Sequence, residues 1–113
     1  MGRRFKEMML REVCDAVGVS RRAVQGYESA GLVSASGRNS RGYLLYDEAA
    51  QEKIRKIKLF QEMGFSIKEI KVLLNAPNHV LKAALEVRVE ELGKENGRLQ
   101  EMIVVAREMI SRL

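Results

Sequence analysis

The feature of this 113-residue sequence that most constrains its fold is a heptad pattern over the last third. The a positions are Val89, Asn96, Ile103 and Ile110. The d positions are apolar throughout: Leu85, Leu92, Leu99, Ala106 and Leu113. One helix cannot bury such a seam alone, so the seam requires a partner helix. The sequence therefore predicts a long helix, from about His79 to the end, that pairs with a second copy. Packing onto the chain's own domain is the alternative, which the length of the seam disfavours.

The orientation of this pair stays open on the residues alone. β-branched residues at a and leucines at d favour a parallel pair. Asn96 is a polar a residue, which fixes register or strand number with some loss of stability. It lies near the middle of the helix, so in an antiparallel pair it would approach its own copy. Gly93 and Gly97 each weaken the helix by roughly 1 kcal/mol relative to alanine.

The first third of the chain predicts two short helices joined by a tight turn. Leu10, Val13, Cys14 and Val17 have the spacing of one buried helix stripe, which Gly18 ends. Ser20 is then a good N-cap for a second helix, which ends at Gly31. This arrangement is a helix-turn-helix.

One side of the second helix carries small and polar residues. Ala23, Val24, Tyr27 and Ala30 lie on the apolar side. The opposite side, called the reading face below, consists of Arg22, Gln25, Gly26 and Ser29. Such side chains suit a DNA groove, where they reach base edges and phosphates. An ordinary solvated helix face explains this segment equally well by itself.

The following segment favours the DNA-binding interpretation. Residues 33–46, VSASGRNSRGYLLY, predict a short strand, a turn that carries Arg38 and Arg41, and a second strand with tyrosines and leucines. This is a wing-like hairpin beside the helix-turn-helix.

Two further helices follow the wing. Asp47 can cap a helix with Ala50, Ile54 and Ile57 on its core side, and Gly64 ends it. Ser66 and Glu69 form a capping box for the next helix, which Asn75 and Pro77 end. The predicted fold is therefore mainly α: a winged helix-turn-helix head over residues 1–76, followed by a coiled-coil dimerisation helix over residues 77–113.

Charge and composition narrow the function further. The net charge is +5, and residues 1–46 hold eight Lys or Arg against four Asp or Glu, so the basic excess lies where a polyanion would bind. One cysteine, Cys14, and one histidine, His79, leave no disulfide, metal cluster or nucleophile–base pair. We therefore expect that the chain is not an enzyme and that it binds neither a cofactor nor a metal ion. The start lacks the pattern of a signal peptide, and no apolar run approaches the roughly 20 residues that span a membrane, so we expect a cytoplasmic protein.

Several separated motifs, in this order, resemble the MerR family of bacterial transcription regulators. They are EVCDAVGVSRRAVQGYESAGLV, RGYLLYDE and IRKIKLFQEMGFSIKEIKVLL. The resemblance implies a homodimer held by an antiparallel coiled coil, which binds a near-palindromic operator in double-stranded DNA. Members of this family bend and untwist promoter DNA so that RNA polymerase can bind both promoter elements. Such proteins recognise how easily a DNA sequence deforms, in addition to its bases.

The reading face, the wing and the resemblance together give the residues that we expect to contact DNA. The candidates are Ser20, Arg21, Arg22, Gln25, Tyr27, Arg38, Arg41 and Tyr43. Tyr27 matches a tyrosine that contacts phosphate in the family, and Glu28 matches a structural glutamate. Gln25, Gly26 and Leu44 depart from the family's usual arginine, tyrosine and arginine. An altered reading face is therefore expected.

Two other functions compete with this interpretation. An excisionase-like architectural protein would bend DNA with similar heads, although the long paired helix disfavours it. A protein-interaction module that has lost DNA binding would explain the departures at Gln25 and Leu44, although the basic head disfavours it. Three explanations fit the lack of a recognisable effector site in the sequence. We favour a short regulator that responds to no ligand over a regulator with a ligand crevice that the sequence does not reveal, or a fragment of a longer regulator.

Overall fold

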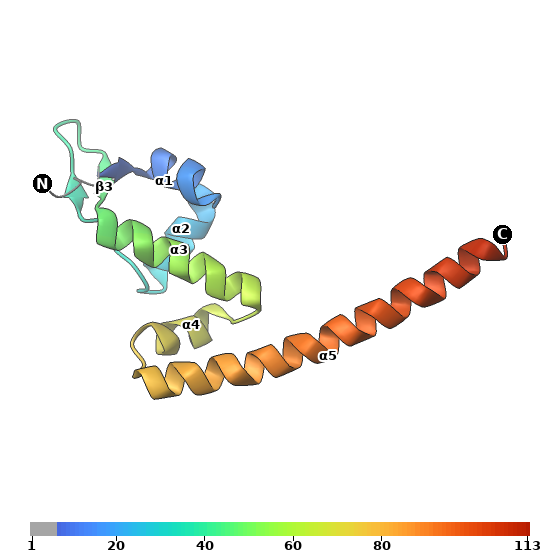
Figure 1. Cartoon of the computed structure of the whole chain (residues 1–113). Coiled ribbons are helices and arrows are strands. Elements are labelled where there is room, and N and C mark those ends of the chain that lie inside the picture. Colours follow the sequence, from blue (N-terminus) through green and yellow to red (C-terminus); the bar gives the residue numbers. More distant parts are fainter. Residues whose placement is uncertain (1–6) are drawn as a thin grey trace, which may run out of the picture. The chain divides into compact units, whose positions relative to one another are not determined.

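The computed structural model describes residues 7–113 (Figure 1). The start of the chain, on which the expectation of no signal peptide rests, lies outside these residues, as do Arg3, Arg4 and Lys6 of the basic excess. The described residues form two compact units, one that ends at Asn75 and one over Ala76–Leu113. Each unit is described by itself below.

The first unit begins its helical part with the predicted helix-turn-helix. Helix α1 spans Leu10–Val17 and ends at Gly18, which has a left-handed φ of 78° that suits glycine. Helix α2 spans Arg21–Ser29. The Ser20 hydroxyl caps it by accepting the Ala23 amide at 3.0 Å. Both predicted boundaries are confirmed.

A small antiparallel sheet forms the wing, in the order β1-β3-β2. Strand β1 is Met8–Met9, β2 is Gly37–Arg38 and β3 is Leu44–Tyr46. Met8 pairs with Tyr46, and Gly37 pairs with Leu45. One expectation needs correction, and one strand was not predicted. The first wing strand lies at residues 37–38 and does not begin at Val33, which is buried in irregular structure instead. Strand β1 was not predicted, because two residues show no periodicity.

Two more helices complete this unit as predicted. Helix α3 spans Glu48–Met63 and α4 spans Ile67–Leu74. The Ser66 hydroxyl accepts the Glu69 amide at 3.1 Å, and the Glu69 carboxylate accepts the Ser66 amide at 3.0 Å, which is the predicted capping box. Helix α1 contacts α2, α3 and β3, so the core lies between the helix-turn-helix, the wing and α3 (Figure 1).

The core combines the predicted apolar stripes with one amide. Its largest fully buried side chains are Tyr46, Ile54, Ile57, Ile70, Val13 and Val24. Gln51 is also buried, and its side-chain amide donates to the Tyr46 carbonyl at 2.8 Å. Since a buried polar group is stable only when it is hydrogen-bonded, this contact explains how glutamine joins the core. It also ties the start of α3 to the end of β3.

The cap of α3 gives a pH-dependent contribution to stability. The Asp47 carboxylate accepts the Ala50 amide at 2.9 Å, and this bond, followed by the Ser36 hydroxyl, lowers the pKa of Asp47 from 3.8. Because the folded pKa lies below the unfolded value, the charged cap stabilises the fold above about pH 4, and this stabilisation is lost as the pH falls through the folded pKa.

An Asp47→Asn variant tests this contribution, because asparagine keeps a cap acceptor that does not titrate. Urea unfolding between about pH 6 and about pH 3 should show the wild type losing more free energy of unfolding than the variant. Glu101→Gln, at an exposed position on the last helix, should keep the wild-type pH dependence. Equal pH dependence of the wild type and Asp47→Asn would contradict the assignment.

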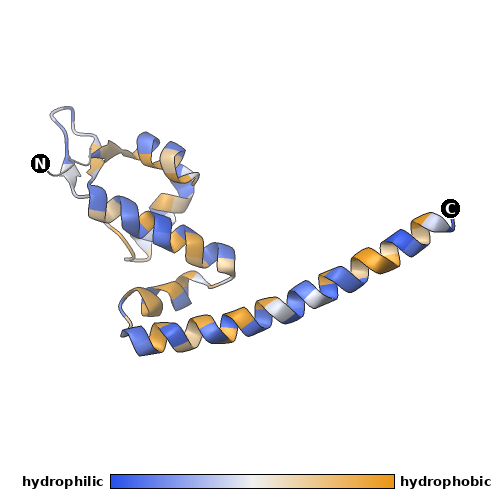
Figure 2. Ribbon diagram, viewed as in Figure 1, coloured by the Kyte–Doolittle hydropathy of each residue, from blue (hydrophilic) through white to orange (hydrophobic). Residues whose placement is uncertain are grey.

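The second unit is one long helix, α5, over Asn78–Ser111. Apolar and polar residues alternate along it (Figure 2). In the single chain the seam is open to solvent, since the exposed fractions of Val89, Leu99 and Ile110 are 68%, 53% and 68%. Dimerisation through the seam stays a prediction, which this exposure supports. Within the part of the chain that the structure describes, no helix is long and apolar enough to cross a membrane.

Candidate nucleic-acid interface

The reading face of α2 is fully presented to solvent. Arg22, Gln25, Gly26 and Ser29 are all exposed, whereas Val24 on the opposite side is completely buried. A Cβ atom added to Gly26 would meet no heavy atom within 4 Å. Gly26 therefore does not serve internal packing, and the space above its backbone is free for another molecule.

Two tyrosine hydroxyls hold α2 in place from behind. The Tyr27 hydroxyl donates to the Gln61 side-chain oxygen on α3 at 2.6 Å. The Tyr46 hydroxyl on β3 donates to the Glu28 carboxylate at 2.6 Å. Burial, followed by the bond to Glu28, strongly raises the pKa of Tyr46, so the phenol stays protonated and keeps donating. The reading face is thus fixed relative to both the wing and α3.

Tyr27 differs from its expected role. Its exposed fraction is 3%, and burial raises the pKa of its hydroxyl, which is already bonded to Gln61. The apolar stripe of α2 predicts this placement correctly, whereas the family match suggested a phosphate contact. The bond to Gln61 therefore makes Tyr27 a residue that positions α2 against α3.

The start of α2 carries two positive charges in an unfavourable place for the helix itself. Arg21 and Arg22 are its first two residues, and no acidic residue lies in its first turn. The positive end of the helix dipole disfavours cations there. Both side chains are exposed. The two guanidinium groups therefore do not stabilise the helix, and they remain exposed at this end of α2.

The wing presents the remaining predicted residues in a compact turn. The Asn39 side-chain oxygen accepts the Arg41 and Tyr43 amides at 2.9 and 3.0 Å. The Arg38 guanidinium donates to the Gly42 carbonyl at 2.7 Å, which anchors this side chain across the turn. Tyr43 is 58% exposed, and Arg41 is exposed as well. The wing therefore offers cations and one aromatic ring on an ordered frame.

A groove connects part of the wing to the starts of α1 and α2. It has a volume of about 490 Å³. From the predicted set it brings together Arg21, Arg38 and Tyr43, while Arg41 and the reading face lie outside its lining. It also includes Arg11, which the sequence reasoning missed. The signal for Arg11 was its position in the first turn of α1, where a cation is unexpected.

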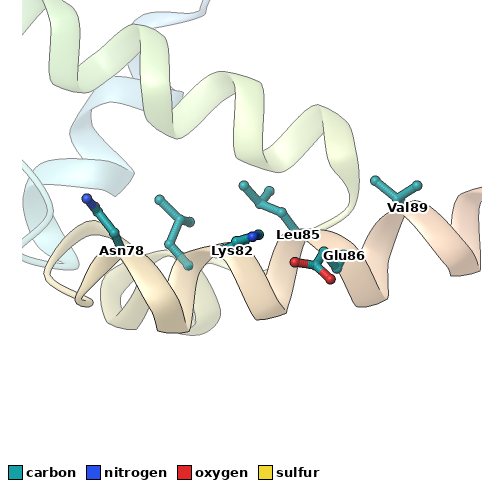
Figure 3. Close-up of a pocket in the computed structure, with 6 residues that line it drawn as sticks. Asn78, Lys82, Leu85, Glu86 and Val89 are labelled. Carbon is teal, nitrogen blue, oxygen red and sulfur yellow. The ribbon is translucent and has the colours of Figure 1, made fainter.

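On α5 the predicted dimerisation residues recur along the helix. Figure 3 shows the side chains of Leu85 and Val89 projecting to the same side of the helix, as expected for residues four apart. Together with Asn78 and Lys82 they line a shallow hollow of about 430 Å³ along the first turns of α5. The later seam residues, from Leu92 to Ile110, are exposed.

Metal and thiol chemistry receive no support from the arrangement of the side chains. Among residues 7–113, no group of three or more His, Cys, Asp or Glu residues is placed to hold a metal ion. Cys14 is partly buried in the stripe of α1, and burial raises the pKa of its thiol. A raised pKa lowers the thiolate fraction, which fits a packing role.

The fold and the exposed basic face define a winged helix-turn-helix protein. Residues 8–77 match the family model described as MerR HTH family regulatory protein. The chain is 38% identical to the HTH-type transcriptional activator mta of Bacillus subtilis over 94 residues. This alignment covers 83% of this chain and 37% of mta. It is 31% identical to the HTH-type transcriptional activator TipA of Streptomyces coelicolor over 91 residues, and this alignment covers 80% of this chain and 36% of TipA.

Solved structures agree with these relatives. The N-terminal part of the Bacillus subtilis multidrug transporter activator, MtaN, superposes with a TM-score of 0.70 at 35% identity, over 91% of this chain and 97% of that one. HiNmlR, a MerR family regulator bound to promoter DNA, shares the fold with a TM-score of 0.72 at 13% identity, over 94% and 89% of the two chains. The chain belongs to the MerR HTH family of regulatory proteins, which are not enzymes. It spans about a third of the length of relatives such as mta and TipA.

Proposed function

We propose that this chain is a transcription regulator that binds duplex DNA through its winged head. The observation that carries the proposal is the reading face, which is exposed, free of internal contacts at Gly26 and preceded by two arginines at an unfavourable helix end. The family membership and the names of the relatives mta and TipA support the same function.

Individual roles follow from chemistry and exposure. Arg22 and Gln25 reach the base edges, since arginine pairs with guanine and glutamine with adenine. Arg21, Arg38 and Arg41 bind phosphates, and Tyr43 packs against the backbone of the duplex. The Ser20 hydroxyl is engaged as the cap of α2, so it sets the position of this helix end.

We further propose that α5 pairs with α5 of a second copy through the seam Leu85, Val89, Leu92, Asn96, Leu99, Ile103, Ala106 and Ile110. Burial of the exposed apolar side chains drives the pairing. Two heads related by a two-fold axis match a near-palindromic operator. An antiparallel pair would set the heads far apart, and bending of the promoter DNA between them would then present it to RNA polymerase.

A binding selection from randomised duplex DNA at moderate salt tests this function. We expect enrichment of an inverted repeat, whose centre-to-centre spacing reports the separation of the two heads. Sedimentation of the same protein should give a dimer. If the folded dimer enriches no sequence and its affinity for duplex does not depend on salt, the chain does not bind DNA, and a protein-interaction role replaces the proposal.

Gly26 gives a prediction in which stability and DNA binding change in opposite directions. Gly26→Ala should raise the free energy of unfolding by about 1 kcal/mol, because alanine favours helix and nothing lies within 4 Å of the new methyl group. The affinity for the selected duplex should fall, because this methyl group occupies the space where the backbone approaches the DNA.

The matched control is Gly97→Ala, which makes the same exchange at an open position of α5. It should raise stability without a change in DNA affinity. Urea unfolding and fluorescence anisotropy measure the two quantities. Equal or tighter DNA binding by Gly26→Ala would show that the α2 backbone does not approach the duplex.

A further inference from the structure

The groove between the wing and the starts of α1 and α2 has the composition of a phosphate site. Three arginines and no carboxylate are among its lining residues: Met9, Leu10, Arg11, Arg21, Arg38, Gly42, Tyr43 and Leu44. Its remaining surface is largely apolar. We propose that a phosphodiester of the bound DNA strand lies in this groove, held by Arg11 together with Arg21 and Arg38, with its deoxyribose against the apolar floor. This inference rests on the proposed function and adds Arg11 to it.

Arg11 has no evident structural role. It is the second residue of α1, in the first turn, where the positive end of the helix dipole disfavours a cation. The nearby Glu12 side chain instead accepts the Met9 amide at 3.0 Å, which is the favourable use of this helix end. None of the ion pairs among the described residues includes Arg11, and its side chain is exposed. The position of Arg11 in the groove explains its charge, since the guanidinium group can bind a phosphate there.

The other two arginines are suited to the same task. Arg38 is anchored by its bond to the Gly42 carbonyl, which uses one of the five guanidinium donors and leaves the others available. Arg21 begins α2, immediately before Arg22 of the reading face. A planar guanidinium binds phosphate oxygens in a two-pronged manner, so three of them around one groove can hold a phosphodiester from several sides.

The apolar floor distinguishes a DNA strand from a small anion. Leu10, Tyr43 and Leu44 come from α1 and the wing and contribute apolar surface to the lining of the groove. A free phosphate ion gains nothing from such a surface, whereas a deoxyribose buries its carbon atoms against it. Arg21, in the lining of the groove, and Arg22, on the reading face, are both in the first turn of α2, so we expect one DNA strand to reach both.

The effect of Arg11→Ala on DNA binding tests the assignment. The probe is a fluorescein-labelled duplex that carries the inverted repeat obtained by selection, titrated at several salt concentrations. We expect about tenfold weaker binding for the dimer and a shallower salt dependence, because each head loses one of the three cations that contact the phosphate in the groove. Arg98→Ala removes the same charge from an exposed position of α5 and should leave both quantities unchanged.

Unchanged affinity and salt dependence in Arg11→Ala, with normal binding by the wild type, would overturn this inference but leave the proposed function standing. Absence of salt-dependent binding by the wild type would instead overturn the proposed function. A thermal unfolding midpoint at or above that of the wild type confirms that Arg11→Ala is folded.

Duplexes with one neutral methylphosphonate locate the contact. At the phosphate held in the groove, this change should weaken the wild type more than it weakens Arg11→Ala, in which only Arg21 and Arg38 still contact that phosphate. If every methylphosphonate that weakens the wild type also weakens Arg11→Ala equally, Arg11 contacts no phosphate and the assignment is wrong.

Discussion

Leu99→Asp should convert the protein from a dimer to a monomer at micromolar concentration. Leu99 occupies a d position of the seam and is 53% exposed in the single chain, so its burial depends on a partner helix. Loss of two buried leucines removes about 3 to 6 kcal/mol per dimer. Each 1.4 kcal/mol is a factor of ten in a dissociation constant, so the dimer should weaken at least about 100-fold.

Analytical ultracentrifugation at several concentrations measures this change. Lys94→Asp is the control, because it introduces aspartate into the same helix at an exposed position outside the a and d sites. It should remain a dimer, so a monomer in the first variant cannot be explained by the lower helix propensity of aspartate. DNA affinity should fall with the dimer, since two heads no longer bind together. A dimeric Leu99→Asp would place the interface on another surface.

Arg22→Ala should produce the second large effect, on DNA binding and without loss of stability. Arg22 lies on the exposed reading face at the start of α2. Removal of an arginine that contacts a guanine weakens binding by about 1 to 3 kcal/mol per copy, and relaxes the base preference at that position. The dimer carries two copies, so the combined loss reaches about 2 to 6 kcal/mol for independent half-sites. The helix itself should become no less stable, because a cation leaves the positive end of its dipole.

Competition between the selected duplex and single-base variants separates base contact from phosphate contact. A base contact predicts that Arg22→Ala loses discrimination at one position of each half-site. A phosphate contact instead predicts equal weakening on all sequences and a salt dependence shallower by about 0.9 per copy. Ser29→Ala, which changes a small exposed residue later on the same face, should have a much weaker effect. If Arg22→Ala binds like the wild type, the reading face is not where DNA binds.

Much of the head was predictable because its boundaries depend on local chemistry. Gly18 and Gly64 end their helices in left-handed conformations, and Asp47 and Ser66 cap theirs with side-chain oxygens. These signals lie within a few residues of the boundary that they determine. The apolar stripes then predicted which sides are buried, as Val13, Ile54 and Ile57 show with no exposed surface.

Features that depend on distant partners were not predictable in this way. Strand β1 exists because Met8 and Met9 pair with β3, more than thirty residues away along the chain. Gln51 is buried because the Tyr46 carbonyl accepts its amide, and Tyr27 is held by Gln61 of α3. The groove has the same origin, since Arg11, Arg21 and Arg38 come from three separate elements. A sequence pattern within one element contains no information on these pairings.

In α2 the residues that hold the helix in place differ from the residues exposed on its outer side, and this difference affects how the protein can evolve. The groups that hold the helix, Tyr27 and Glu28, lie apart from the exposed residues of its outer side, and a side chain at Gly26 would contact no other element of the head. Substitutions on that outer side can therefore accumulate without unfolding the protein. A duplicated copy could acquire a new target sequence through a few changes at positions 22, 25, 26 and 29, while its inherited scaffold remains intact.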